Sequence, residues 1–208
     1  MLRNYSNRPN LVAIGSSAGG PSALAKVFSQ LPSGLGAAFV VSQHMPRGFT
    51  KQLSERLTTI SNVQVREAES DDVLLAETAL ITLGGHNMEV VRDGRIHLER
   101  AAQTPSPSID IMMRSAASAY GPRCMGVIMT GMLTDGVLGM TAIKNAGGVT
   151  IAQDESSSLV FGMNKAAIQA GAVDIVVHIS DIAHTIARSL AGYSSRNRHR
   201  SDPSSKLQ

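Results

Sequence analysis

Residues 11–21, with the sequence LVAIGSSAGGP, predict a buried strand that turns directly into a helix. The apolar residues 11–14 do not alternate with polar ones, which is typical of a strand covered on both faces. The small residues 15–20 suit a tight turn, and Pro21 suits the first turn of a helix. Apolar residues then follow at helical spacing: Leu24, Val27, Phe28 and Leu31. This stretch is therefore a strand–turn–helix unit of an α/β protein.

The same alternation of apolar strands with amphipathic helices continues along the chain. Strands are predicted at 37–41, 63–66, 79–83, 125–129, 149–152 and 175–177, and helices at 48–60, 108–119, 136–145, 165–170 and 181–190. Residues 89–92 and 95–99 alternate around Asp93-Gly94, which is typical of a two-residue hairpin turn. We therefore predict an α/β fold with three layers: a doubly wound, mainly parallel sheet with an added antiparallel β-hairpin.

The length of 208 residues is enough for one such domain. We expect an N-terminal extension over 1–10, one domain over 11–193 and a disordered basic tail over 194–208. Hydrophobic residues make up 43% of the chain and the mean hydropathy is +0.03, so a disordered chain is excluded. No apolar run reaches the roughly 18 residues of a spanning helix, so we expect a protein that is not embedded in a membrane. The single cysteine, Cys124, excludes an internal disulfide and favours a cytoplasmic location.

The distribution of charge argues against a nucleic-acid partner. The net charge is +3, and the four basic residues and one acidic residue of 194–208 account for all of it. A neutral body with 3% aromatic residues and no Trp lacks the basic face and stacking side chains of a nucleic-acid reader. His86 and Glu89 have an H-x-x-E spacing, but they begin a predicted hairpin and no third ligand is evident. We therefore expect no metal site.

Three loops that follow predicted strands carry residues suited to nucleophilic catalysis. Residues 15–19 fit G-x-S-x-G, in which a sharp turn exposes the hydroxyl of Ser17 and the helix N-terminus supplies amides. His44 follows the next strand and has the chemistry of a general base. Asp135 follows the strand at 125–129 and is able to orient and stabilise an imidazole. Because loops at the carboxyl ends of parallel strands share one edge of the sheet, these residues are candidates for one site.

Each of these residues also has a simpler interpretation. The glycine-rich loop could be a plain connection or a phosphate cradle, although it fits neither G-x-G-x-x-G nor the P-loop. His44 could be a hydrogen-bonded loop histidine, and Asp135 could be the N-cap of the helix that follows it. The residues alone leave these alternatives open.

Several stretches resemble the catalytic signatures of the chemotaxis protein-glutamate methylesterase family, the CheB-type catalytic domain. They occur in the same order between about Leu11 and Leu190: Ile14–Gly20, Gln43–Phe49, Thr130–Gly136, and 150–155 with 160–163. The resemblance implies a serine hydrolase without a cofactor or metal. Its implied substrates are glutamate methyl esters on the cytoplasmic helices of methyl-accepting chemoreceptors, and many members also deamidate receptor glutamines.

The resemblance also implies a role for each matching residue. Ser17 would be the nucleophile, His44 the general base and acid, and Asp135 the group that orients His44. Ala18 and Met132 would line the oxyanion or substrate pocket. With ten residues before the first predicted strand, we expect no receiver domain, so phosphorylation control would come from a separate receiver or signalling protein.

This sequence departs from the family pattern at four places. Ala18 stands where Thr is usual, Leu133 where Gly is usual, Ser106 where Arg is usual, and Leu83-Gly84-Gly85 where Pro-Gly-Asp is usual. None of these is one of the three catalytic positions, so they bear on the substrate more than on activity. The leading hypothesis is a stand-alone methylesterase. The alternatives are a receptor-binding interaction module with little or no turnover and a small-molecule esterase.

Overall fold

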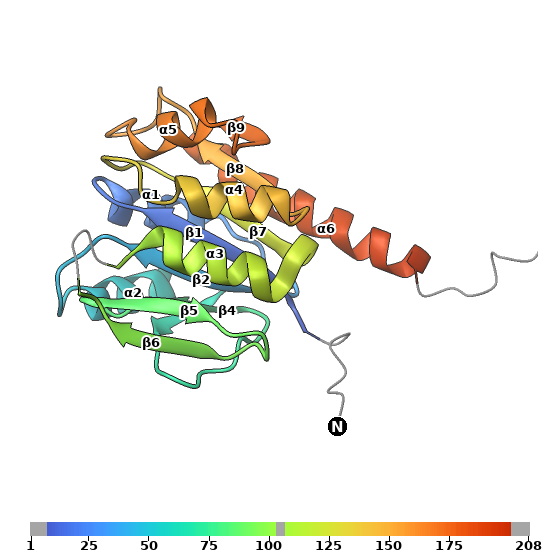
Figure 1. The fold of residues 1–208 in the computed structure, drawn as a ribbon, viewed down its shortest axis with the longest axis horizontal. Coiled ribbons are helices and arrows are strands. Elements are labelled where there is room, and N and C mark those ends of the chain that lie inside the picture. Colours follow the sequence, from blue (N-terminus) through green and yellow to red (C-terminus); the bar gives the residue numbers. More distant parts are fainter. Residues whose placement is uncertain (1–7, 103–106, 201–208) are drawn as a thin grey trace, which may run out of the picture.

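The structure, a computed structural model, describes the backbone of residues 8–102 and 107–200, with side chains as far as Gly192. Within these ranges seven strands form one parallel sheet in the order β3-β4-β2-β1-β7-β8-β9 (Figure 1). They are β1 (Asn10–Ser16), β2 (Ala37–Gln43), β3 (Gln64–Glu67), β4 (Thr78–Ile81), β7 (Cys124–Ile128), β8 (Val149–Gln153) and β9 (Ile175–Val177). A separate antiparallel hairpin consists of β5 (His86–Val90) and β6 (Ile96–Arg100).

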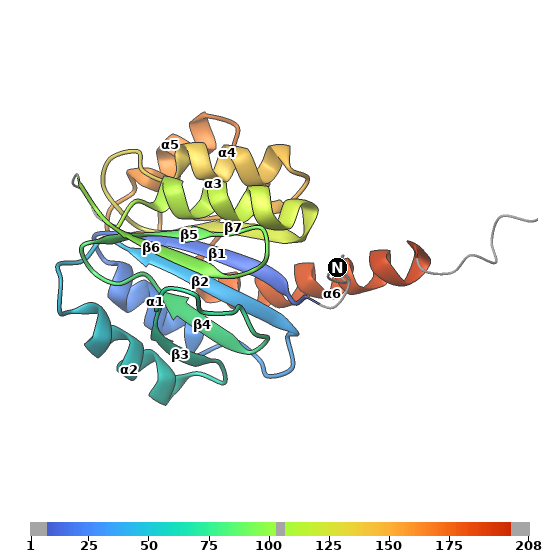
Figure 2. The same cartoon turned by 60° about the horizontal axis from the view of Figure 1, so that its bottom comes forward.

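Helices cover both faces of the sheet. They are α1 (Gly20–Phe28), α2 (Thr50–Ile60), α3 (Ile109–Tyr120), α4 (Val137–Asn145), α5 (Met163–Gln169) and α6 (Ile182–Arg200), with 3₁₀ turns η2 (Gly121–Arg123) and η3 (Ile179–Asp181). Helices α1, α2 and α6 pack on one face, and α3, α4, α5 and the hairpin pack on the other (Figure 2). The predicted three-layer, doubly wound fold with an added hairpin is confirmed.

The central strand β1 shows why its apolar residues do not alternate with polar ones. Val12 and Ile14 point into the core beneath α1, whereas Leu11 and Ala13 point into the core beneath α3. All four side chains are fully buried. A strand between two helical layers has no face for polar residues.

The turn of the hairpin differs from the predicted two-residue turn. Val90 pairs with Ile96, the amide of Val91 donates to the carbonyl of Arg95, and Gly94 has φ +86°. The residues at the tip are therefore Arg92, Asp93 and Gly94. A glycine in the left-handed region at the end of a three-residue loop closes such a hairpin with a bulge.

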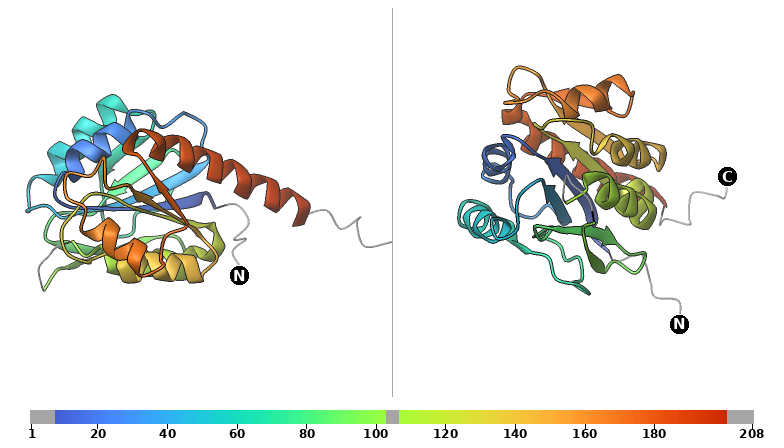
Figure 3. Two further views of the ribbon diagram at one scale, coloured as in Figure 1. Left: turned by 90° about the horizontal axis from the view of Figure 1, so that it is seen from above. Right: turned by 60° about the vertical axis from the view of Figure 1, so that its left-hand side comes forward.

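The strand order has a switch point in the middle of the sheet. Strands β2, β4 and β3 lie on one side of β1, and β7, β8 and β9 lie on the other. The direction of chain progression thus reverses between β1 and β7, and ligand sites of open α/β sheets lie outside the carboxyl ends of strands at such a point. The loops that leave this edge are on the left of Figure 1, the side turned forward in the right panel of Figure 3.

The last helix is longer than expected. We expected it to end at Leu190 and the chain to be disordered from residue 194, but α6 continues to Arg200 and runs away from the sheet (Figure 3, left panel). No proline interrupts residues 182–202 and arginine has a high helix propensity, so a helix already nucleated on the sheet can propagate. Three expectations fall outside the described residues. They concern the N-terminal extension (residues 1–7), the departure from the family pattern at Ser106, and the end of the tail (residues 201–208). No described helix has the length and apolar composition needed to cross a membrane.

Candidate active site

The three candidate residues follow three neighbouring strands. Ser17 directly follows β1, His44 directly follows β2, and Asp135 lies between β7 and α4. Since β2, β1 and β7 are adjacent in the sheet, their carboxyl ends bring the three loops together. His44 Nδ1 lies 3.1 Å from Ser17 Oγ, and His44 Nε2 lies 2.7 Å from Asp135 Oδ2.

The carboxylate determines which nitrogen of His44 carries the hydrogen. A carboxylate can only accept, so the short contact with Asp135 requires a hydrogen on Nε2. In the neutral imidazole, Nδ1 then has a free lone pair directed at the hydroxyl of Ser17. The side chains of His44 and Asp135 are only 11% and 12% exposed, which shields this hydrogen bond from water. The arrangement can therefore move a proton from Ser17 to His44.

Asp135 is held by the N-terminus of α3. Its Oδ2 accepts from the amide of Ile109 at 2.8 Å, and its Oδ1 accepts from the amide of Asp110 at 2.9 Å and from Ser108 Oγ at 3.3 Å. Burial raises the pKa of Asp135, but the hydrogen bonds from His44 and from these two amides outweigh burial and hold the pKa below its ordinary value. The carboxylate stays charged and fixed in position.

The capping role of Asp135 differs from the one considered in the sequence. It does not cap the helix that follows, because Gly136, with φ +97°, is the N-cap of α4. Instead Asp110, in the first turn of α3, accepts from the amide of Gly139 in α4 at 2.7 Å. Each of the two helices therefore has its N-terminus bound by a carboxylate from the other segment. Burial and the neighbouring Asp135 raise the pKa of Asp110, although hydrogen bonds from backbone amides lower it.

Two close backbone approaches hold the turn that carries Ser17. The amide of Ser17 donates to the carbonyl of Thr130 at 2.9 Å, which ties the turn to the end of β7. A Cβ at the next residue, Gly131, would lie 2.7 Å from Ser17 Cβ and 2.3 Å from Met163 Sδ. Only glycine therefore allows the loop that carries Asp135 to pack this closely on Ser17.

Gln43 connects the two loops and was not identified from the sequence. Its side chain is 1% exposed, and its Nε2 donates to the carbonyls of Ser17 and His44, both at 2.9 Å. Its Oε1 accepts from Ser16 Oγ at 2.7 Å. A Cβ at Gly20 would lie 1.8 Å from this Oε1, so glycine is needed there. A glutamine at the buried end of a strand, directly before the candidate base, is the signal that could have suggested this role.

Two amides without an acceptor belong to residues close to Ser17. Within the described part of the chain, the N–H groups of Ala18 and Met132 donate to no acceptor. Ala18 follows Ser17 directly, and Met132 follows Gly131, which packs against Ser17 Cβ. Free amides near a serine hydroxyl are candidates for stabilising a negatively charged oxygen.

An apolar rim and a groove adjoin this site. Met132, Leu133 and Leu159 are 57%, 65% and 77% exposed. Leu159 lies close to Gly19, where a Cβ would be 2.8 Å from Leu159 Cβ. A groove of about 380 Å³ extends from there and is lined by Gly19, Ser22, Ala23, Lys26, Thr130, Gln153, Ser157, Leu159 and Ile179.

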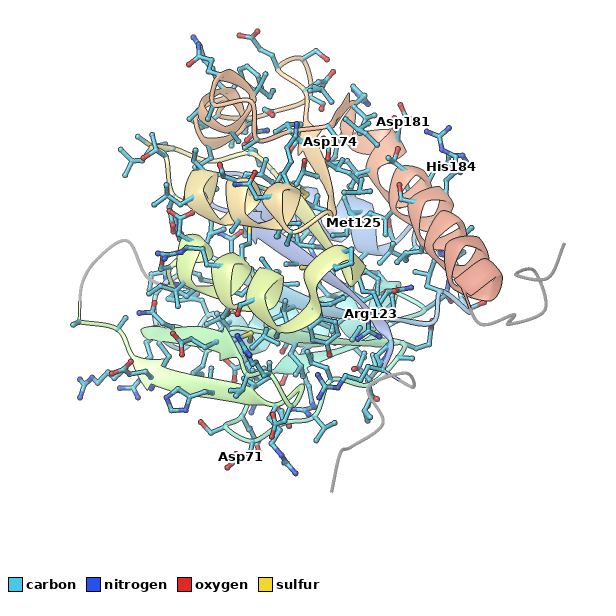
Figure 4. The ribbon with its side chains drawn as sticks, turned by 45° about the vertical axis from the view of Figure 1, so that its right-hand side comes forward. Asp71, Arg123, Met125, Asp174, Asp181 and His184 are labelled. Atoms are coloured by element: carbon cyan, nitrogen blue, oxygen red, sulfur yellow. The ribbon has the colours of Figure 1, made fainter. Side chains whose placement is uncertain are left out.

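The remaining candidates lie elsewhere. His86 is on β5, where its Nδ1 is 3.4 Å from the carbonyl oxygen of Gly84, and no group of three or more His, Cys, Asp or Glu side chains in the described ranges could hold a metal. His184 points to solvent from α6 (Figure 4). Cys124 is fully buried, and burial raises the pKa of its thiol, as expected for a small core residue.

Relatives with curated names share much of this sequence. Relatives from Moorella thermoacetica and Pyrococcus abyssi, both named protein-glutamate methylesterase/protein-glutamine glutaminase, are 44% and 43% identical over 193 and 184 residues. The matches cover 89% and 86% of this chain but 46% and 50% of the relatives, so the chain spans about half the length of the curated relatives it matches.

A solved structure matches nearly all of the fold. The crystal structure of the Thermotoga maritima CheB methylesterase catalytic domain superposes with a TM-score of 0.83 at 34% identity, covering 87% of this chain and 98% of that one. The family model for CheB methylesterase matches residues 12–186. The chain therefore belongs to the CheB methylesterase family.

Proposed function

We propose that this chain is a cytoplasmic serine hydrolase that removes methyl groups from glutamate methyl esters on the cytoplasmic helices of chemoreceptors. Ser17 is the nucleophile, His44 the general base and acid, and Asp135 the orienting carboxylate. The observation that carries the proposal is the continuous hydrogen-bond chain from Ser17 Oγ through both ring nitrogens of His44 to Asp135. The names of the curated relatives support the choice of substrate.

The first half of the reaction forms an acyl-enzyme. Ser17 Oγ attacks the ester carbonyl carbon while its proton moves to Nδ1 of His44. The imidazolium that forms keeps its hydrogen on Nε2, where the charged Asp135 stabilises it. The tetrahedral intermediate collapses, Nδ1 gives its proton to the departing methoxy oxygen, and methanol leaves.

The second half restores the free enzyme. Water attacks the acyl carbon and passes a proton to Nδ1 of His44, and the proton returns to Ser17 Oγ as the glutamate carboxylic acid is released and ionises. A glutamine side chain passes through the same type of tetrahedral intermediate and releases ammonia in place of methanol. We therefore include deamidation of receptor glutamines in the proposal.

The oxyanion would be held by the backbone. The N–H groups of Ala18 and Met132 are without an acceptor among the described residues, and they belong to the residue after Ser17 and to the residue after Gly131, which packs on Ser17. Donors already in place stabilise the developing charge without reorganisation, and one such donor contributes about 3–4 kcal/mol in other hydrolases. Because both donors are main-chain groups, the replacement of the family's usual Thr by Ala18 leaves them in place.

The geometry favours turnover over the alternative of a binding module. A module that only binds receptor has no need for a lone pair of His44 directed at a serine hydroxyl, or for a buried carboxylate behind the ring. The amides at the N-terminus of α3 compensate the desolvation of this buried charge, an arrangement that binding alone does not require.

The experiment measures methanol release from chemoreceptors that carry radiolabelled methyl esters. We expect Ser17→Ala to lower the rate by at least about 10⁴-fold. Ser33→Ala, an exposed serine in the loop between α1 and β2, should retain the wild-type rate. A fluorophosphonate should label wild type at Ser17, as located by peptide mass, and should not label Ser17→Ala.

The two readouts separate the parts of the proposal. Labelling of Ser17 without methanol release would refute the chemoreceptor substrate but leave a serine hydrolase. Absence of both, with receptor binding retained in Ser17→Ala, would favour the binding module.

A further inference from the structure

Leu133 has a backbone conformation that L-residues rarely adopt. Its φ is +66°, and its side chain is 65% exposed. In the left-handed region the Cβ approaches the following carbonyl oxygen, a contact that glycine avoids. A leucine is therefore less favourable than a glycine at this backbone position.

Two other described residues that are not glycine have positive φ, and both are compensated within the fold. Glu77, with φ +60°, accepts from the amides of Gly34 and Gly36 through its carboxylate at 3.2 and 2.7 Å. Asp71, which is labelled in Figure 4, has φ +69°, and its amide donates to the carbonyl of Ile96 at 2.8 Å. Local hydrogen bonds thus accompany the unusual backbone in each case.

Leu133 has no such compensation. Within the described part of the chain, neither its amide nor its carbonyl makes a hydrogen bond. Most of its side chain is in solvent, so packing in the core does not offset the backbone cost either. Within the described ranges neither a hydrogen bond nor core packing offsets this backbone cost, and the exposed part of the side chain is available to contact a bound substrate.

The position of Leu133 places that contact beside the reacting serine. Two residues before it, Gly131 packs on Ser17, and two residues after it, Asp135 bonds to His44. Two trans peptide units span at most about 7.6 Å, so Leu133 Cα lies within that distance of Gly131 Cα. Gly162 packs against the loop, where a Cβ would be 3.4 Å from the Leu133 nitrogen.

We propose that Leu133 is a specificity-determining residue that contacts an aliphatic side chain of the substrate, one helical turn from the scissile glutamate ester. This inference rests on the proposed function. In a helical substrate, residues three and four positions from the ester share its face, and one turn rises about 5.4 Å, which is within reach of this loop. Contact between the Leu133 side chain and another apolar side chain removes both from water and stabilises the complex, whereas a leucine cannot pair with a charge. The contacted residue is therefore aliphatic.

The test compares Leu133→Gly with wild type on two substrates, the methylated chemoreceptor and a p-nitrophenyl ester. We expect KM for the receptor to rise about 10-fold with kcat unchanged, so that kcat/KM falls about 10-fold. Burying one leucine side chain contributes enough free energy for a change in affinity of about 10-fold or more. The effect on the small ester should be about tenfold smaller, and Leu133→Met should restore the receptor KM. Leu75→Gly, which removes an exposed leucine before β4, is the matched control and should behave as wild type.

A second arm changes the substrate. Replacing the aliphatic residues three and four positions from the ester by serine should raise KM for wild type but not for Leu133→Gly. An unchanged receptor KM in Leu133→Gly, or an equal loss on both substrates, would overturn the inference while leaving the proposed function intact. If wild type releases no methanol from receptor, the proposed function fails and this inference fails with it.

Discussion

Replacement of Asp135 by asparagine tests the site most directly. Each oxygen of the carboxylate accepts two hydrogen bonds: Oδ2 from His44 and Ile109, and Oδ1 from Asp110 and Ser108. An asparagine has one oxygen and one NH₂ group, so one of these pairs must face a donor. We expect kcat/KM to fall by about 10³ to 10⁴-fold, or about 4–5.5 kcal/mol of activation free energy.

Both orientations of the new amide account for this loss. If the NH₂ group faces His44, Nε2 must become the acceptor and the hydrogen moves to Nδ1, which can then no longer take the proton of Ser17. If the NH₂ group faces Asp110, the tautomer of His44 is retained, but a neutral oxygen no longer stabilises the imidazolium.

Stability should change as well, and its pH dependence gives an independent check. One buried amide of α3 loses its acceptor when the NH₂ group faces it, which costs about 1–3 kcal/mol. Because the folded-state pKa of Asp135 lies below its unfolded value, the carboxylate stabilises the fold above about pH 4 and loses this contribution as the pH falls through the folded-state pKa. The deficit of the variant should therefore be largest at neutral pH and shrink in acid.

The assays are initial rates of ester hydrolysis and urea denaturation between pH 3 and pH 7. Asp174→Asn is the matched control, because this carboxylate also accepts from a backbone amide, that of Thr150 at 3.0 Å. Asp174 directly precedes β9 and so lies at the amino end of that strand, away from the carboxyl ends that carry the site (Figure 4). It should retain the wild-type rate. A loss of less than 10-fold in Asp135→Asn would refute the assigned role of Asp135.

Three further substitutions test other contacts. Gly131→Ala places a Cβ 2.7 Å from Ser17 Cβ, so we expect steady-state kcat to fall about 100-fold with a much smaller change in the urea midpoint. Activity equal to wild type would show that the loop moves to accommodate the methyl group. Gln43→Leu leaves two carbonyls without their donor and should lower the free energy of unfolding by about 1–3 kcal/mol per carbonyl, together with kcat; a stability loss at full kcat would assign Gln43 to folding alone. Asp110→Asn removes a carboxylate whose folded-state pKa is raised by burial and by Asp135. In urea melts, the stability of the variant relative to wild type should therefore increase as the pH rises from about 3 to about 7, because only wild type must ionise this buried group. A difference that does not change with pH would contradict the raised pKa.

Local signals predicted most elements of the fold. The apolar runs at 11–14 and 37–41 became β1 and β2, and the glycines and Pro21 placed the start of α1 closely. The end of α6 was not predicted, because helix propagation beyond Leu190 depends on a nucleus formed by packing on the sheet. Boundaries that depend on distant contacts carry little local signal.

The residues of the site also differ in whether local sequence or distant contacts reveal them. Ser17, His44 and Asp135 could be proposed from the sequence because residue chemistry and position after a strand are visible locally. Gln43 was not, because its importance comes from two carbonyls in different loops. The capping of α3 by Asp135 joins residues 25 or more positions apart, and no local pattern indicates it.

By itself the sequence determined the class of fold, the turn chemistry at Ser17 and the residues able to do acyl transfer, since these depend on side-chain periodicity and on neighbours in the chain. Only the tertiary structure decided that the loops meet, which nitrogen of His44 faces Ser17, and that no hydrogen bond from the described residues compensates the backbone of Leu133. Apolar strands predict a buried parallel sheet but not the order β2-β1-β7, which sets the distances between the loops. That order follows from how the helices pack on both faces of the sheet, a property of the whole chain.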